Sequence, residues 1–160
     1  MRVEPKGSWW QRRLVGPIRQ QLVQGISPDK IALTLALGLI LGVFPILGAG
    51  FALCGLAAWG LKLNQPLIQA VGTAAYPLQL AMLLPFYRAG EALWGLPPMA
   101  LSIPEMVGRF FADVPRFLSE YGMTGARGIA VWALAAPWGL AGLYYGLRGV
   151  TRRAAARFSP

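Results

Sequence analysis

Uncharged polar side chains are the groups of this chain best suited to hold a ligand. Gln65, Gln69 and Thr73 recur at intervals of four residues, and Tyr76 continues the same helical face. On a helix, this spacing places amide, hydroxyl and phenol groups in one stripe along an otherwise apolar segment. Because each unpaired polar group costs free energy in hydrocarbon, the stripe must face another helix or a cavity.

Two interpretations of the stripe stay open from the sequence. Hydrogen bonds between helices would by themselves satisfy the polar groups. The alternative is a polar pocket or path that holds a substrate. Its candidate lining residues are Pro45, Gly48, Gly50, Asn64, Gln65, Gln69, Thr73, Tyr76, Pro77, Gln79 and Arg88.

Two parts of this set are suited to a phosphate. Gly48 and Gly50 can expose backbone amides to an anion where a helix begins, although a tight turn demands the same glycines. Arg88 is the cation nearest the end of the stripe and can meet a phosphate. Arg88 with Glu91, one turn further on, can equally serve as an anchor at a membrane interface.

The chain offers little for catalysis or metal binding. It has no histidine, and its long uncharged stretches contain no acidic residue. Cys54 is the single cysteine, has no candidate base beside it, and is expected to be a small packing residue. Zinc-binding spacings and a phosphate-binding P-loop are absent from the sequence. We therefore expect a protein that is not an enzyme and that uses no cofactor and no metal ion.

Three uncharged stretches must position the polar residues: 31–61, 63–87 and 128–147. The chain is 56% hydrophobic and 13% charged, whereas ordinary soluble proteins are about 25% charged. A helix crosses a hydrocarbon core in about 20 residues. The composition and the stretch lengths therefore predict an all-α, polytopic membrane protein.

The first stretch is interrupted by Phe-Pro-Ile-Leu-Gly-Ala-Gly at 44–50. It is long for one straight span and short for two. We predict a re-entrant or broken helical hairpin, with half-helices at about 28–43 and 51–61. Irregular backbone at membrane depth persists only where protein or a water-filled cavity surrounds it.

The second stretch is predicted to kink at Tyr76-Pro77, and the third to be a straighter span. Paired helix breaks are typical of transporter sites at the membrane midplane, although proline is also frequent in membrane helices. Small residues four apart let helices approach closely. We therefore assign helix packing, and a homo-oligomer, to Gly38, Gly42, Gly142 and Gly146.

The membrane domain is predicted to cover residues 28–147, and it includes an amphipathic loop at 88–127 with a second interfacial helix after Ser102. Residues 1–27 form a basic amphipathic segment at the interface before this domain. Residues 148–160 form a basic tail that is expected to be mobile.

The distribution of charge predicts how the chain is oriented in the membrane. Residues 1–30 carry six Lys or Arg and two acids, and residues 148–160 carry four Arg and no acid, within a net charge of +9. The positive-inside rule then places both termini in the cytoplasm with two complete crossings; a three-span arrangement is the alternative. Because these charges flank apolar stretches, we expect anionic lipid headgroups, and no nucleic acid, as partners.

Three ordered motifs accompany these elements. The first runs from Ser-Pro at 27–28 to Gly-Val-Phe-Pro-Ile-Leu-Gly at 42–48, and the second is Leu-Lys-Leu-Asn-Gln-Pro at 61–66. The third is Tyr-Pro-Leu-Gln at 76–79, followed by Pro-Phe-Tyr-Arg-Ala-Gly at 85–90. Together they resemble the DUF2062 family of small bacterial integral membrane proteins over about residues 20–150. Tyr76 and Gln79 replace the Asn and Thr usual in the third motif, so no family role is carried over to them.

This resemblance implies a place in the bacterial cytoplasmic membrane but little chemistry, because DUF2062 denotes a domain of unknown function. Some relatives look fused to glycosyltransferases, which implies proximity to polyprenyl-phosphate sugar carriers or envelope lipids. Our leading hypothesis is non-enzymatic transport or handling of an amphipathic, lipid-linked phosphate. The alternative is a membrane adaptor or scaffold for an envelope-biogenesis glycosyltransferase or another partner. An enzyme is the least supported class.

Overall fold

The structure is a computed structural model that describes residues 27–97 and 102–158 of the chain. Each regular element in these ranges is an α-helix, which confirms the all-α prediction. The helices are α2 (Pro28–Gly42), α3 (Ala49–Leu61), α4 (Gln65–Ala74), α5 (Tyr76–Leu93), α6 (Ile103–Ala112) and α7 (Val114–Phe158). The predicted amphipathic segment at residues 1–27 lies outside the described residues except for Ser27.

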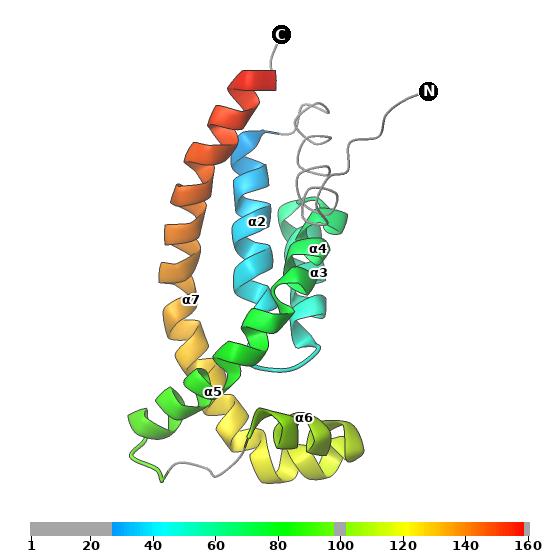
Figure 1. The fold of residues 1–160 in the computed structure, drawn as a ribbon, viewed down its shortest axis with the longest axis vertical. Helices are drawn as coiled ribbons and strands as arrows, with labels where there is room; N and C mark the ends of the chain where they lie inside the picture. Colours follow the sequence, from blue (N-terminus) through cyan, green and yellow to red (C-terminus); the bar gives the residue numbers. More distant parts are fainter. Residues whose placement is uncertain (1–26, 98–101, 159–160) are drawn as a thin grey trace.

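Helices α2 and α3 form an antiparallel hairpin around the predicted break (Figure 1). Ser27 caps α2, its hydroxyl accepting from the Lys30 amide at 3.4 Å, and Pro28 occupies the first turn. Gly48 starts α3 with φ at 81°, a left-handed conformation that glycine adopts without strain. At a rise of about 1.5 Å per residue, both helices are shorter than the roughly 30 Å hydrocarbon core.

Helices α4 and α5 meet at a bend of 60°. The bend lies at the predicted Tyr76-Pro77 position, because Pro77 has no backbone N–H and belongs in the first turn of a new helix. Helix α5 then continues through Pro85 to Leu93. The predicted second stretch is therefore two helices in series.

Helix α7 is continuous across two of the predicted segment boundaries. It has 45 residues and begins within the predicted loop, where the Asp113 side chain accepts from the Arg116 amide at 3.1 Å. It ends at Phe158, so the arginine tail that was expected to be mobile is helical. Ala and Arg are good helix formers, and ion pairs described below hold this part of α7 against α2. Figure 1 shows the first turns of α7 lying across the foot of the molecule beside α6.

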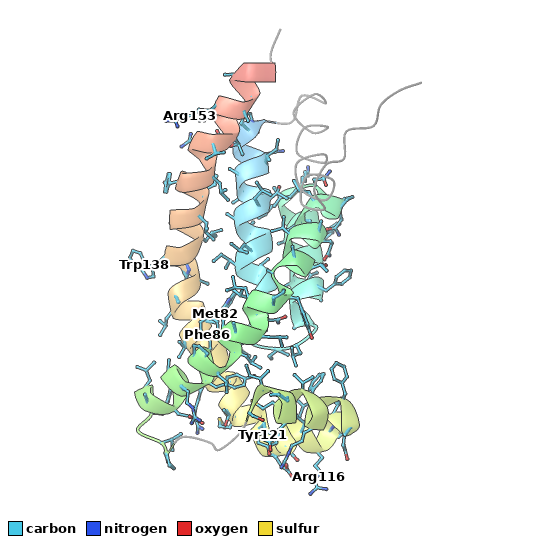
Figure 2. The ribbon with its side chains drawn as sticks, in the orientation of Figure 1. Met82, Phe86, Arg116, Tyr121, Trp138 and Arg153 are labelled. Atoms are coloured by element: carbon cyan, nitrogen blue, oxygen red, sulfur yellow. The ribbon has the colours of Figure 1, made fainter. Side chains whose placement is uncertain are left out.

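One helix of the described residues, α7, is long and apolar enough to cross a membrane by itself. The bent pair α4–α5 passes the same criterion when the two helices are taken together, and α3 is a shorter apolar helix. Large apolar side chains face outward on several helices, among them Trp138 of α7 at 81% exposure, which Figure 2 shows pointing away from the other helices.

Glycines set the distance between α2 and α4. A Cβ atom added at Gly38 would lie 2.9 Å from the Val71 Cβ, and one at Gly42 would lie 3.0 Å from the Gly72 Cα. In contrast, a Cβ at Gly142 or Gly146 would meet no atom of the described residues within 4 Å. Packing of those two glycines against another molecule stays a prediction.

A second close crossing joins α5 to α7. A Cβ at Gly128 would lie 2.5 Å from the Tyr87 ring, and one at Gly90 would lie 3.0 Å from the Arg127 Cβ. The sequence analysis did not find this pair of glycines, because they lie on different helices and share no local motif. The crossing holds α5 against the break between α2 and α3.

Candidate ligand pocket at the helix break

Side chains from later helices complete the backbone of the break. The Gln79 amide donates to the carbonyl oxygens of Phe44 at 2.7 Å and Ile46 at 3.2 Å. The Tyr87 hydroxyl donates to the Pro45 carbonyl at 2.8 Å. Buried carbonyl groups outside regular structure need such partners, and these bonds hold the break in one shape.

One more donor comes from α7. The indole N–H of Trp132 donates to the Ile40 carbonyl near the end of α2 at 3.2 Å. The Trp132 ring also packs edge-on against Phe44, with ring centroids 4.9 Å apart. The break is therefore attached to both α5 and α7.

A half-open pocket of about 140 Å³ lies beside the break, where α2, α3, α4 and α5 meet. We call it the polar pocket. Its lining residues are Gly42, Gly48, Gly50, Phe51, Gln69, Gly72, Thr73, Tyr76 and Gln79. The structure thus brings together six of the predicted candidates, and their role in binding stays a prediction.

The other five candidates lie outside the polar pocket. Asn64 caps α4, its side chain accepting from the Leu67 amide at 2.8 Å. Gln65 donates to the Gly55 carbonyl at 3.4 Å. Arg88 pairs with Glu91 at 3.1 Å, more than two turns beyond Gln79 on α5.

The two prolines among the predicted candidates lie in the backbone of the break and at the start of α5, outside the polar pocket. Pro45 is buried, and its carbonyl accepts from Tyr87. Pro77 is exposed in the first turn of α5. A lining that continued from Asn64 to Arg88 would need one straight helix, and the bend between α4 and α5 prevents it.

The polar pocket offers both hydrogen-bond donors and an acceptor. Gly48, the N-cap of α3, provides no side-chain cap for the first-turn amides of this helix. One of these amides, that of Ala49, donates to the Ile46 carbonyl at 3.3 Å. These amides also form the positive end of the helix dipole. Gln69 donates to the Phe51 carbonyl at 3.1 Å, and its Oε1 atom is buried with no hydrogen-bond partner among residues 27–97 and 102–158.

Hydrogen bonding between helices accounts for part of the stripe. Gln65, Gln69 and Gln79 each donate their side-chain amide to a backbone carbonyl of the α2–α3 hairpin or its break. Hydrogen bonding between helices does not explain why Gln69 Oε1 has no partner among the described residues. Nor does it explain why Thr73 and Tyr76 are exposed on the pocket wall. Hydrogen bonding between helices therefore explains some atoms of the stripe, and the binding interpretation stays a prediction.

Comparison with known families covers nearly the whole chain. The profile of DUF2062, described as an uncharacterized protein conserved in bacteria, matches residues 11–157. The chain belongs to the DUF2062 family. No curated protein and no solved structure matches it. The polar pocket and the helices around it lie entirely within the DUF2062 region.

An ion-pair cluster lies at one end of this DUF2062 protein. Arg152 binds Asp29 through two nitrogens, at 3.0 and 2.9 Å, and the Arg148 Nε lies 3.0 Å from the same carboxylate. Hydrogen bonding to Arg152 is the main cause that holds the pKa of Asp29 below its ordinary value. Desolvation opposes it, and hydrogen bonding to Arg148 adds to the lowering. The start of α2 and the C-terminal part of α7 therefore lie side by side.

Charges at the foot of the DUF2062 fold are balanced instead. Glu105 forms a capping box with Ser102, whose backbone N–H lowers the pKa of this carboxyl. Arg116 pairs with Glu120 at 3.0 Å. Within residues 27–97 and 102–158, no three His, Cys, Asp or Glu side chains are grouped closely enough to hold a metal ion.

Proposed function

We propose that this protein binds and moves an amphipathic lipid-linked phosphate without chemically changing it. The observation that carries this proposal is the polar pocket beside the helix break. Donors and an acceptor meet there within a molecule whose outer surface is largely apolar. Phe51, with 68% exposure, lines the pocket and presents the hydrocarbon surface that lipid chains require.

The head of such a lipid fits the groups of the pocket. A phosphate accepts hydrogen bonds from the first-turn amides of α3 and is stabilised by the helix dipole. A hydroxyl of the head donates to Gln69 Oε1, which would otherwise remain buried without a partner. Thr73 and Tyr76 add hydroxyl groups at the pocket wall. A lipid head that carries both phosphate and hydroxyl groups can bind the α3 amides, Gln69 Oε1 and these hydroxyl groups together.

The arrangement in the bacterial cytoplasmic membrane follows from the helices. Helix α7 makes one crossing, the bent pair α4–α5 makes the second, and the α2–α3 hairpin re-enters from the side on which it begins. The cationic end of α7 beside Asp29 then faces the cytoplasm with both termini, in keeping with the positive-inside rule. The polar pocket lies at the depth of the break.

Native mass spectrometry of the protein in mild detergent tests the proposal. The wild type should retain a polyprenyl phosphate, and Gln69→Leu combined with Thr73→Leu should reduce the retained fraction at least tenfold. Gln65→Leu is the matched control, because it removes an amide from the same stripe outside the pocket. Equal retention by the wild type and the double variant would contradict the proposal.

A second candidate function is a membrane adaptor, favoured by the outer face of α7. Trp138, Gly142, Tyr145 and Gly146 are exposed on this face, and the two glycines leave space for a close helix neighbour. An adaptor for a glycosyltransferase, or a homo-oligomer, would use this face. Leucine at Gly142 and Gly146 should then release the partner or the second copy, while leucine at Gln69 and Thr73 leaves the assembly intact.

A further inference from the structure

A second pocket, which shares no residue with the polar pocket, lies where α5, α6 and α7 meet. It measures about 130 Å³, and we call it the apolar pocket. Leu83, Met106, Phe110, Phe117 and Ile129 are among its lining residues, together with the leucine at the tip of the helix break, Leu47. Apolar cavities of about 150 Å³ bind benzene, so this one has room for several methylene groups.

A charged pocket adjoins it. This pocket measures about 310 Å³ and is lined by Arg109, Asp113, Arg116 and Glu120. Phe117 and Tyr121 line both pockets, so the charged space and the apolar space have a common wall. Figure 2 shows Tyr121 and Arg116 at the foot of the molecule, away from the end that carries Arg153.

The charged side chains of this pocket differ in whether they already form an ion pair. Arg116 is already paired with Glu120 at 3.0 Å. Arg109 donates to the Tyr121 hydroxyl at 2.9 Å, and Asp113 accepts from the Arg116 backbone amide at 3.1 Å. Neither Arg109 nor Asp113 forms an ion pair among the described residues, although Arg109 also lies close enough to Glu105 to lower the pKa of that carboxyl. One cationic and one anionic side chain therefore lie in a pocket that shares a wall with the apolar pocket.

We propose that these two pockets together bind one zwitterionic phospholipid with a primary ammonium group. Its phosphate binds Arg109, its ammonium binds Asp113, and one acyl chain enters the apolar pocket between α5, α6 and α7. An anionic phospholipid such as phosphatidylglycerol has no ammonium group, so it would leave the carboxylate of Asp113 without a cationic partner beside the bound phosphate. The site is separate from the polar pocket and does not depend on the function proposed for it.

Two glycines make the apolar pocket testable. A Cβ added at Gly122 or Gly125 meets no atom within 4 Å, so larger side chains there extend into the pocket that both residues line. Gly142 and Gly146 on the same helix are equally open but face outward. Leucine at the first two positions fills the pocket, and leucine at the second two is the matched control for any effect on the helix.

The experiment is native mass spectrometry of the full-length, delipidated protein titrated with phosphatidylethanolamine and phosphatidylglycerol of identical chains. The wild type should bind one phosphatidylethanolamine at least tenfold more tightly than phosphatidylglycerol. Gly122→Leu with Gly125→Leu should weaken this binding at least tenfold, and Gly142→Leu with Gly146→Leu should leave it unchanged. Equal binding of the two lipids, or equal loss in both double variants, would overturn the proposal.

A measurement on the wild type keeps the test independent of how the variants fold. Phosphatidylethanolamine with a diazirine in its acyl chain should cross-link to residues 103–129, and Arg109→Gln should reduce this product several-fold relative to Arg153→Gln. Cross-links confined to 130–156 would overturn the assignment. The Gln69→Leu, Thr73→Leu variant should keep the cross-link, which separates this site from the polar pocket.

Discussion

The side-chain amide of Gln79 lies 2.7 Å from the carbonyl oxygen of Phe44, across 35 residues of sequence. Gln79 is only 4% exposed, so the bond is shielded from water. A buried carbonyl left without its donor costs about 1–3 kcal/mol. This one contact therefore links the second apolar stretch of the sequence to the irregular backbone of the first.

Replacing Gln79 by leucine should lower the free energy of unfolding by about 1–3 kcal/mol, because the carbonyls of Phe44 and Ile46 both lose a donor. Unfolding by denaturing detergent measures the change. Gln65→Leu is the control: its bond to Gly55 is 3.4 Å long and exposed, so the expected change is within about 0.5 kcal/mol. A Gln79→Leu protein as stable as the wild type would show that the break does not need this donor.

Gly42→Ala should destabilise the protein by about 1–3 kcal/mol, because the new Cβ would lie 2.8 Å from the Ala75 Cβ and 3.0 Å from the Gly72 backbone. Gly142→Ala changes helix propensity in the same way but adds its Cβ in open space. The difference between the two variants isolates the cost of separating α2 from α4. Thermal unfolding of both in the same detergent checks it, and equal melting temperatures would rule out a tight crossing.

The ion pairs of Asp29 predict a dependence of stability on pH. Because Arg152 and Arg148 lower the pKa of this carboxyl below 3.8, the folded state binds its proton less readily than the unfolded state. The stabilisation is therefore complete above pH 3.8 and disappears as the pH falls through the lower pKa of the folded state. Wild type and Asp29→Asn should differ in melting temperature at pH 6 and converge below pH 3.8. A constant difference down to the lowest pH would contradict this linkage.

Single cysteines test the orientation of α7. In a Cys54→Ala background, which removes the natural thiol, Arg116→Cys and Arg153→Cys place one reactive group near each end of the helix. A membrane-impermeant maleimide added to cells with a permeable outer envelope should label position 116 directly and position 153 only after lysis. The Cys54→Ala protein without a new cysteine should remain unlabelled. Labelling of both positions before lysis would refute a crossing by α7.

The helices could be predicted where local signals were strong. The Ser27-Pro28 start, the interruption after Gly42 and the proline bend at Pro77 each follow from residues that are neighbours in sequence. The long helix α7 was divided into loop, span and tail, because its arginines interrupt the apolar pattern. The last of these parts is held against α2 by the pairing of Arg148 and Arg152 with Asp29, 119 and 123 residues away. Such a pairing has no local signature.

Only part of the candidate site, likewise, could be predicted from the sequence. Helical spacing brought Gln69 and Thr73 into one stripe, and both line the polar pocket. The donors of Tyr87 and Trp132 to the backbone of α2 and its break were not foreseen. Both residues lie in apolar surroundings, where an aromatic side chain suits packing or an interface equally well, so their hydrogen bonds become visible only when the helices are placed.

The helix break also determines the order in which the molecule can be built. Gln79 lies 33 residues beyond Ile46, Tyr87 lies 42 beyond Pro45, and Trp132 lies 92 beyond Ile40. When α2 and α3 leave the ribosome, the carbonyls of Phe44 and Ile46 have only their local donors, the amides of Ile46 and Ala49. The three side-chain donors become available only after α5 and α7 have been synthesised. Completion of the break is therefore a late step of biogenesis, and a chain truncated before α7 should lack the bond from Trp132 to α2.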